Sequence, residues 1–121
     1  MQRFSPGQVA EQTGFTLDTL RYYERIGLLD GIARTSGGQR VFTADDIAWL
    51  EILRCLRETG MPIARMLRYA ELARDGDGTM PARMALLEAH DREIEQRIAS
   101  LREEQRHIRE KIGWYRSQLA I

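Results

Sequence analysis

The sequence has 121 residues, which suffices for one compact domain with an appended element but not for two full hydrophobic cores. Apolar residues make up 43% of it and aromatic residues only 7%, so the core must be largely aliphatic. The net charge is zero, and residues 1–60 contain seven Arg against eight Asp or Glu. This balance excludes a nucleic-acid surface that relies on a general positive field, and leaves one built from a few placed arginines.

A single cysteine, Cys55, excludes an intramolecular disulfide framework and a multi-cysteine zinc site within one chain. No basic-then-apolar leader is present, and no apolar run approaches the ~18 residues that a membrane span needs. We therefore expect a cytoplasmic protein with no membrane partner, no metal and no cofactor.

The first 27 residues predict two short helices. Ser5 followed by Gln8 is a capping-box pattern, which predicts a helix over residues 6–13 that ends at Gly14. Thr16 is the expected N-cap of a second helix, which ends at Gly27. Two short helices joined around a glycine are typical of a helix-turn-helix. The apolar residues expected to face the core are Val9, Ala10, Leu17 and Leu20.

Residues 28–43 change character, because glycines separate short extended segments. Segments 32–35 and 39–42, joined at Ser36-Gly37-Gly38, predict a small β-hairpin, or wing. Thr43 then caps a helix predicted from Asp45 to about Thr59, and a further helix is expected from Met61-Pro62 to about Arg74. The core positions of the first of these two helices are Ile47, Leu50, Ile52, Leu53 and Leu56.

The C-terminal part predicts one long helix, which follows a linker-like run over residues 75–79. No helix breaker intervenes between Pro81 and Gly113. From Ile94 onward the apolar positions alternate in steps of four and three, with Gln105 at one of them, and this 3.5-residue period indicates a coiled coil. One helix cannot bury such a stripe alone, so a second chain is the simplest partner. The expected domains are a DNA-binding head, 1–75, and a dimerisation helix, 76–121.

The order of these motifs resembles the MerR family of bacterial transcription regulators. The stretches that carry the resemblance are Arg21-Tyr22-Tyr23-Glu24, Gly27-Leu28-Leu29, Gly38-Gln39-Arg40-Val41-Phe42 and Gly60-Met61-Pro62-Ile63. The resemblance implies a mainly α fold: a winged helix-turn-helix head with a small β-hairpin wing, then a long antiparallel dimerisation coiled-coil helix. It also implies a homodimer that binds double-stranded DNA at a palindromic promoter and distorts it, with RNA polymerase on the same promoter.

Several site residues follow from the resemblance. Arg21 would contact the groove or the backbone of DNA, and Tyr23 would donate to a phosphate, whereas we expect Tyr22 in the core. In the wing, Arg40 would clamp a phosphate with Arg34 nearby.

The sequence departs from the family pattern in the wing, where Gln39 and Phe42 replace two tyrosines. Phe42 has no hydrogen-bond donor, so only a packing role is expected of it. Base reading is expected at the start of the second helix, from Thr16, Asp18 and Thr19. Asp18 would either accept from a cytosine amino group or cap the helix, and capping is the simpler role.

Metal-sensing members of the family carry cysteines at the start of the dimerisation helix and beyond its end, and this sequence has none there. His90 and His107 are too far apart on one helix to share a metal within a chain, and both are expected to face solvent. Drug-sensing members carry a large effector domain after the coiled coil, whereas this sequence stops at Ile121.

The position of Cys55 is similar to that of the lone cysteine in the AdhR/NmlR-like branch, which responds to aldehydes and nitrosative stress. A lone thiol can be alkylated, S-nitrosated or joined to a small thiol, and Arg54 and Arg57 would favour the reacting thiolate if they lie close. A buried, inert cysteine is the competing interpretation.

Two alternatives stay open from the sequence. One is a MerR-type regulator with a non-covalent effector or none, and another is a coiled-coil interaction protein that does not bind DNA. An enzyme is not expected, because no Ser/His/Asp set, phosphate-binding glycine loop or metal-ligand spacing is present.

Overall fold

The computed structural model describes residues 2–120, which are mainly helical. The chain divides into two compact units, Met1–Arg83 and Met84–Ile121. The expected domains divide at residue 75 instead, and their outer limits, 1 and 121, lie outside the described residues. The predicted fold class, a helical head with a small hairpin followed by a long helix, is confirmed. The elements are α1 (Pro6–Thr13), α2 (Leu17–Ile26), β1 (Ala33–Arg34), β2 (Arg40–Val41), α3 (Ala44–Glu58), α4 (Ile63–Arg74), the 3₁₀ helix η1 (Asp77–Thr79) and α5 (Met80–Leu119).

Local capping explains the bounds of α1 and α2. The Ser5 hydroxyl accepts from the Gln8 amide (3.2 Å), while the Gln8 side chain accepts from the Ser5 amide (2.8 Å), so the predicted capping box is confirmed. Gly14 ends α1 with φ +78°, and a Cβ there would lie 3.4 Å from the Arg54 guanidinium. Gly27, at φ +93°, ends α2 in the same way.

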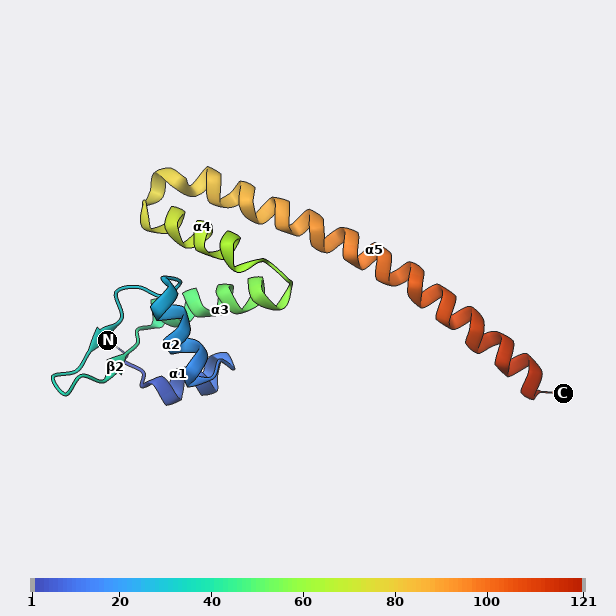
Figure 1. The fold of residues 1–121 in the computed structure, drawn as a ribbon, viewed down its shortest axis with the longest axis horizontal. Coiled ribbons are helices and arrows are strands. Elements are labelled where there is room, and N and C mark those ends of the chain that lie inside the picture. The colour runs from blue at the N-terminus through green and yellow to red at the C-terminus, as the bar shows by residue number, and fades with distance from the viewer. Residues whose placement is uncertain (1, 121) are drawn as a thin grey trace. The chain divides into compact units, whose positions relative to one another are not determined.

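The wing is a two-stranded antiparallel hairpin, in which Ala33 pairs with Val41 and Arg34 pairs with Arg40. Its turn is closed by the Thr35 amide donating to Gln39 O (2.8 Å) and the Gly38 amide donating to Thr35 O (2.9 Å). Within the first unit the hairpin projects away from α1, α2 and α3 (Figure 1). A bridge between Phe4 and Phe42 attaches its base to the N-terminal segment.

The core of the first unit lies between α1, α2, α3 and α4. Four of the five core positions predicted on α3 are buried, and Ile52 is half-buried. Leu17 is wrongly predicted, because it is 41% exposed at the first position of α2, before that helix meets the core. The buried apolar side chains include Val9, Phe15, Leu20, Tyr23, Leu28, Leu29, Phe42, Leu50, Leu53, Leu56 and Met66.

Two contacts connect α3 to its neighbours. Trp49 donates its indole N–H to Leu28 O (2.8 Å), which ties α3 to the segment after α2. The ring of Trp49 also stacks on that of Tyr69 of α4, with centroids 5.5 Å apart. The end of the helix-turn-helix is therefore held from the α3 side.

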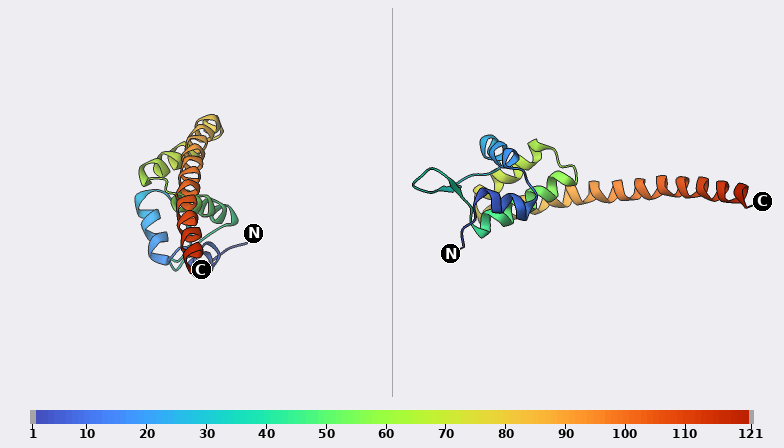
Figure 2. Two further views of the ribbon diagram at one scale, coloured as in Figure 1. Left: turned by 90° about the vertical axis from the view of Figure 1, so that its right-hand side faces the viewer. Right: turned by 90° about the horizontal axis from the view of Figure 1, so that it is seen from below.

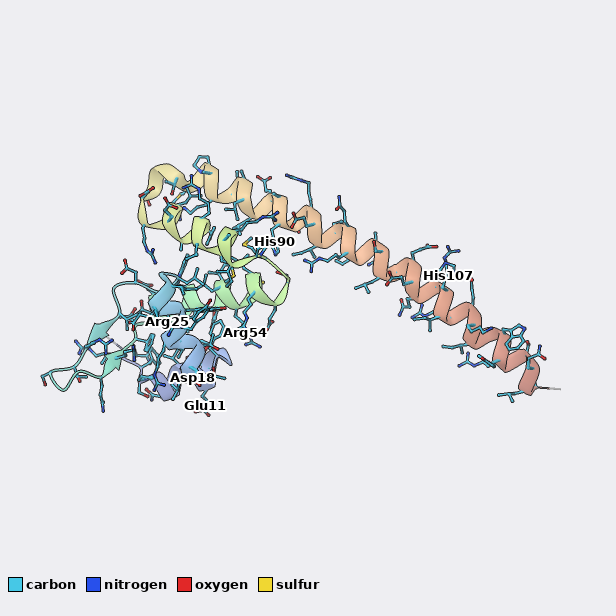
Figure 3. All side chains as sticks on the ribbon, in the orientation of Figure 1. Glu11, Asp18, Arg25, Arg54, His90 and His107 are labelled. Atoms are coloured by element: carbon cyan, nitrogen blue, oxygen red, sulfur yellow. The ribbon has the colours of Figure 1, made fainter. Side chains whose placement is uncertain are left out.

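The helix α5 runs unbroken from Met80 to Leu119 and passes through Gly113 without ending (Figures 1 and 2). No helix in the described part of the chain is long and apolar enough to cross a membrane. His107 lies on the surface as expected, but His90 is buried, so the prediction that both face solvent is wrong for His90 (Figure 3). The apolar side chains left exposed on α5 are Met80, Met84, Ile98, Leu101, Ile108, Ile112, Trp114, Tyr115 and Leu119.

Candidate nucleic-acid interface

The start of α2 presents a cluster of exposed polar side chains. Thr16 caps the helix, since its hydroxyl oxygen accepts from the Thr19 amide (3.1 Å), and its hydroxyl donates to Thr19 Oγ1 (2.9 Å). The hydroxyl of Thr16 therefore stabilises the start of α2. It lies beside the hydroxyl of Thr19, at the N-terminal end of the helix, where base reading is expected.

Asp18 and Arg21 form a surface ion pair one turn apart on α2, with 3.2 Å between Arg21 Nη1 and Asp18 Oδ1. The Asp18 side chain is 95% exposed and that of Arg21 60%. A pair this exposed contributes ~0.5 kcal/mol, so a phosphate could replace the carboxylate at little cost. Asp18 also lies in the first turn of α2, where a negative charge is favourable.

The two tyrosines of α2 have the opposite burial from the one predicted. Tyr22, expected in the core, is 40% exposed and packs under the Arg25 guanidinium, 5.3 Å from the ring centroid. Tyr23, expected at a phosphate, is 1% exposed and its ring meets Phe15 edge-on. Within residues 2–120 its hydroxyl is buried and has no hydrogen-bond partner. The phosphate role of Tyr23 stays a prediction that this conformation does not favour.

Both wing arginines lie against Glu24 of α2. Glu24 Oε1 accepts from Arg40 Nε (2.8 Å), lies 2.7 Å from Arg40 Nη2 and is 3.5 Å from Arg34 Nη2. Arg34 also donates from Nη1 to Gly38 O (3.0 Å), which braces the hairpin turn. Arg34 and Arg40 lie together as expected, whereas the contact of both with Glu24 was not predicted.

A groove between α2 and the wing brings together two of the predicted contact residues, Arg21 and Arg40. Arg21 and Leu17 line it from α2, and Gln39 and Arg40 line it from the hairpin. Phe42 lies at its base and is buried, in keeping with a packing role. Two guanidinium groups from different elements therefore border one open groove, an arrangement that suits contacts to a phosphate backbone.

Cys55 lies on the solvent side of α3 and is exposed, so the interpretation as a buried cysteine is wrong. A shallow depression around it is lined by Gln12, Arg54, Glu58 and Thr59. The Arg54 guanidinium donates to Thr13 O (2.9 Å) and to Glu58 (2.9 Å), so it serves the α1–α3 junction. Among the described residues, no three His, Cys, Asp or Glu side chains gather closely enough to hold a metal ion.

Comparison with known families identifies the kind of protein that carries this interface. The family model described as MerR HTH family regulatory protein matches residues 4–71, and the model described as MerR, DNA binding matches residues 47–111. The chain belongs to the MerR family. It is a DNA-binding transcriptional regulator of the MerR type, and members of this family are not enzymes. Membership decides against the interaction protein that does not bind DNA.

Individual relatives agree with the AdhR/NmlR-like branch. An uncharacterised HTH-type regulator of Haemophilus influenzae is 33% identical over 98% of this chain and 87% of its own length. AdhR of Bacillus subtilis is 42% identical over 66% of this chain, which corresponds to 57% of AdhR. HiNmlR, a MerR family regulator lacking the sensor domain and crystallised bound to promoter DNA, superposes with a TM-score of 0.78 and 35% identity. That superposition covers 84% of this chain and 77% of HiNmlR.

Proposed function

We propose that this MerR regulator binds a palindromic promoter as a homodimer, with each α2 in a major groove and each wing on the flanking phosphates. The observation that carries the proposal is the groove that Arg21 and Arg40 line from two different elements. The likeness to HiNmlR, a protein crystallised on promoter DNA, supports the same use of this surface. The contact set is Thr16, Asp18, Thr19, Arg21, Arg34 and Arg40, and the exposed Tyr22 is better placed than Tyr23 to reach a phosphate.

The proposed dimer forms through α5. Its heptad positions from Ile94 to Leu119, apart from Gln105, carry large apolar side chains that are mostly exposed in the single chain, including Leu101, Ile108 and Ile112. At ~1.5 Å per residue this segment gives a seam of roughly 37 Å. A second α5 would remove the stripe from water by knobs-into-holes packing.

An antiparallel arrangement suits both the spacing and the charges of this seam. The spacing of the heptad positions is symmetric about the midpoint between residues 106 and 107, so in an antiparallel pair each of these positions faces another heptad position of the partner subunit. The eight positions are Ile94, Ile98, Leu101, Gln105, Ile108, Ile112, Tyr115 and Leu119. The flanking positions then pair Glu95 with Arg116 and Glu104 with Lys111 of the partner subunit, which are opposite charges. In this register Arg102 faces Arg109 of the partner subunit, which is a like-charge pair. In a parallel register, two of the three flanking pairs of charged residues would be like-charge pairs and one would be attractive.

A two-fold dimer of this kind would contact two half-sites related by the same symmetry. We propose that it bends and untwists the promoter between them, so that RNA polymerase can engage elements separated by an overlong spacer. The proposed place of action is the cytoplasm, where a bacterial promoter lies.

Cys55 is the proposed sensor residue, which would react with the inducer, and the exposure of its side chain supports this role. Addition of the Cys55 thiol to an aldehyde would form a carbon–sulfur bond while the carbonyl oxygen takes up a proton. The product is a hemithioacetal, and no oxidant or leaving group is needed. A non-covalent effector, or none, is the competing proposal.

The promoter-binding proposal is tested by replacing Arg40 with Ala. We expect weaker binding to a duplex that the wild-type protein selects from a random library, and a salt slope lower by about one for each lost phosphate contact. Equilibrium titration over a range of salt concentrations measures both quantities. The matched control is Arg106→Ala, which removes an arginine from the outer face of α5. Unchanged affinity and slope in the Arg40 variant would rule out the assigned role.

A further inference from the structure

The hairpin register brings two positive charges together in the wing. Arg34 and Arg40 are direct partners across the antiparallel pair, so their side chains leave the same face of the hairpin. Like charges directly opposite one another destabilise a strand pair, and a two-stranded hairpin has little stability of its own. A nearby negative charge is therefore needed to hold both guanidinium groups on this face.

Glu24 supplies this charge from a different element. Its Oε1 atom lies 2.8 Å from Arg40 Nε and 2.7 Å from Arg40 Nη2, and 3.5 Å from Arg34 Nη2. The side chains of Glu24 and Arg40 are each only 25% exposed, so this ion pair is less screened by water than the Asp18–Arg21 pair.

The same contact connects the two parts of the proposed DNA surface. Glu24 is on α2, two residues beyond Tyr22, whereas Arg40 is in β2 and shares the groove with Arg21. An ionised carboxylate on α2 thus fixes the direction in which the wing arginines present their remaining N–H groups. It also offsets part of their charge, which weakens their attraction to phosphates in general, so that contacts made in the fixed orientation matter more.

We propose that Glu24 is a positioning residue for DNA recognition: it holds Arg34 and Arg40 in one orientation relative to α2, and thereby favours the correct promoter over other DNA. This inference rests on the proposed phosphate role of the wing arginines. Without the Glu24 charge, the two arginines would be free to bind phosphate in many orientations. Non-specific binding would gain, and promoter binding would lose the advantage of a fixed wing.

The test is Glu24→Gln, which retains the shape of the side chain and removes its charge. Affinity is measured for the library-selected duplex and for a scrambled duplex of the same composition, each across a range of salt concentrations. We expect tighter binding to the scrambled duplex with a salt slope steeper by about one, and a ratio of specific to non-specific affinity lower by about fivefold.

The matched control is Glu51→Gln, which removes an exposed negative charge from α3. A second variant, Glu24→Asp, keeps the charge but withdraws the carboxylate from Arg40, and should lower the ratio without steepening the slope. Folding of each variant is checked by circular dichroism at the binding temperature. A ratio and slope in both Glu24 variants equal to those of the control would overturn the inference.

The Arg40→Ala variant separates this inference from the proposed function. When Arg40→Ala is combined with Glu24→Gln, the effect of the Glu24 change on the ratio should shrink, because its main partner is gone. If Arg40→Ala alone leaves DNA binding unchanged, the proposed wing contact fails. If Arg40→Ala weakens binding while Glu24→Gln behaves as the control, the positioning role of Glu24 alone fails.

Discussion

The arginines of the proposed DNA surface have acidic partners in the free protein. Arg21 pairs with Asp18, and Arg34 and Arg40 both lie against Glu24. These partners explain how a head with no excess positive charge can still present guanidinium groups. In the proposed complex a phosphate would displace the exposed Asp18 more easily than the half-buried Glu24, so Arg21 would be free to move while Arg40 stays in place.

The buried hydroxyl of Tyr23 leads to a stability prediction. Because Tyr23 Oη is buried without a hydrogen-bond partner among the described residues, Tyr23→Phe should raise the free energy of unfolding by about 1 kcal/mol. Urea unfolding at a fixed protein concentration measures this change. Tyr22→Phe, at the exposed neighbour, is the control and should alter stability little. A clear loss of stability in the Tyr23 variant would show that its hydroxyl has a partner after all. A loss of DNA affinity there would restore its predicted phosphate role.

The proposed thiol input is tested by Cys55→Ser, which keeps the size of the side chain and removes the nucleophilic sulfur. The variant should bind the library-selected duplex as the wild type does, and its transcription from that duplex in vitro should no longer respond to formaldehyde. Mass spectrometry of the wild type under the same conditions should find the adduct on Cys55. A normal transcriptional response in the serine variant would eliminate the covalent input and favour the non-covalent effector.

At the scale of elements, helix bounds were predictable because the signals that set them are local. Ser5 with Gln8, Thr16 with Thr19 and Thr43 with Asp46 each form their cap within three residues. The glycines that end α1 and α2 adopt positive φ values that favour glycine. Such contacts need no knowledge of the tertiary fold, so sequence reasoning could place them.

The faces of the helices and the links between elements were harder to predict. The helical pattern that placed Leu20 correctly put Leu17 in the core, and the expectations taken from the family resemblance exchanged the environments of Tyr22 and Tyr23. Those outcomes depend on where α2 meets α1 and α3, which the sequence alone does not specify. Glu24 and Arg40 are 16 positions apart, and only the path of the hairpin brings them together. Arg21 and Arg40 could be predicted as contact residues, but the Glu24 carboxylate that contacts Arg40 could not.

At the scale of the whole molecule, the proposed dimerisation would connect the DNA-binding surface to a two-fold operator. The exposed stripe on α5 has too many large apolar side chains to stay in water, and its heptad spacing specifies a helical partner. Because Gln105 lies opposite Ile108 in the proposed antiparallel register, the polar seam residue does not meet its own copy. The charges on either side of the seam therefore decide between parallel and antiparallel pairing.

Lys111 distinguishes the two arrangements. In the antiparallel register it faces Glu104 of the partner subunit, so Lys111→Glu should weaken the dimer by about 1 kcal/mol over the two symmetric pairs. In a parallel coiled coil Lys111 would face Arg116 of the partner subunit, and the same change would strengthen the dimer. Sedimentation equilibrium at low salt measures the dissociation constant, and Arg106→Glu, on the outer face of α5, is the matched control. The double variant Glu104→Lys/Lys111→Glu should recover wild-type affinity, because the exchange restores the antiparallel pairs. Tighter dimerisation in Lys111→Glu would contradict the antiparallel arrangement.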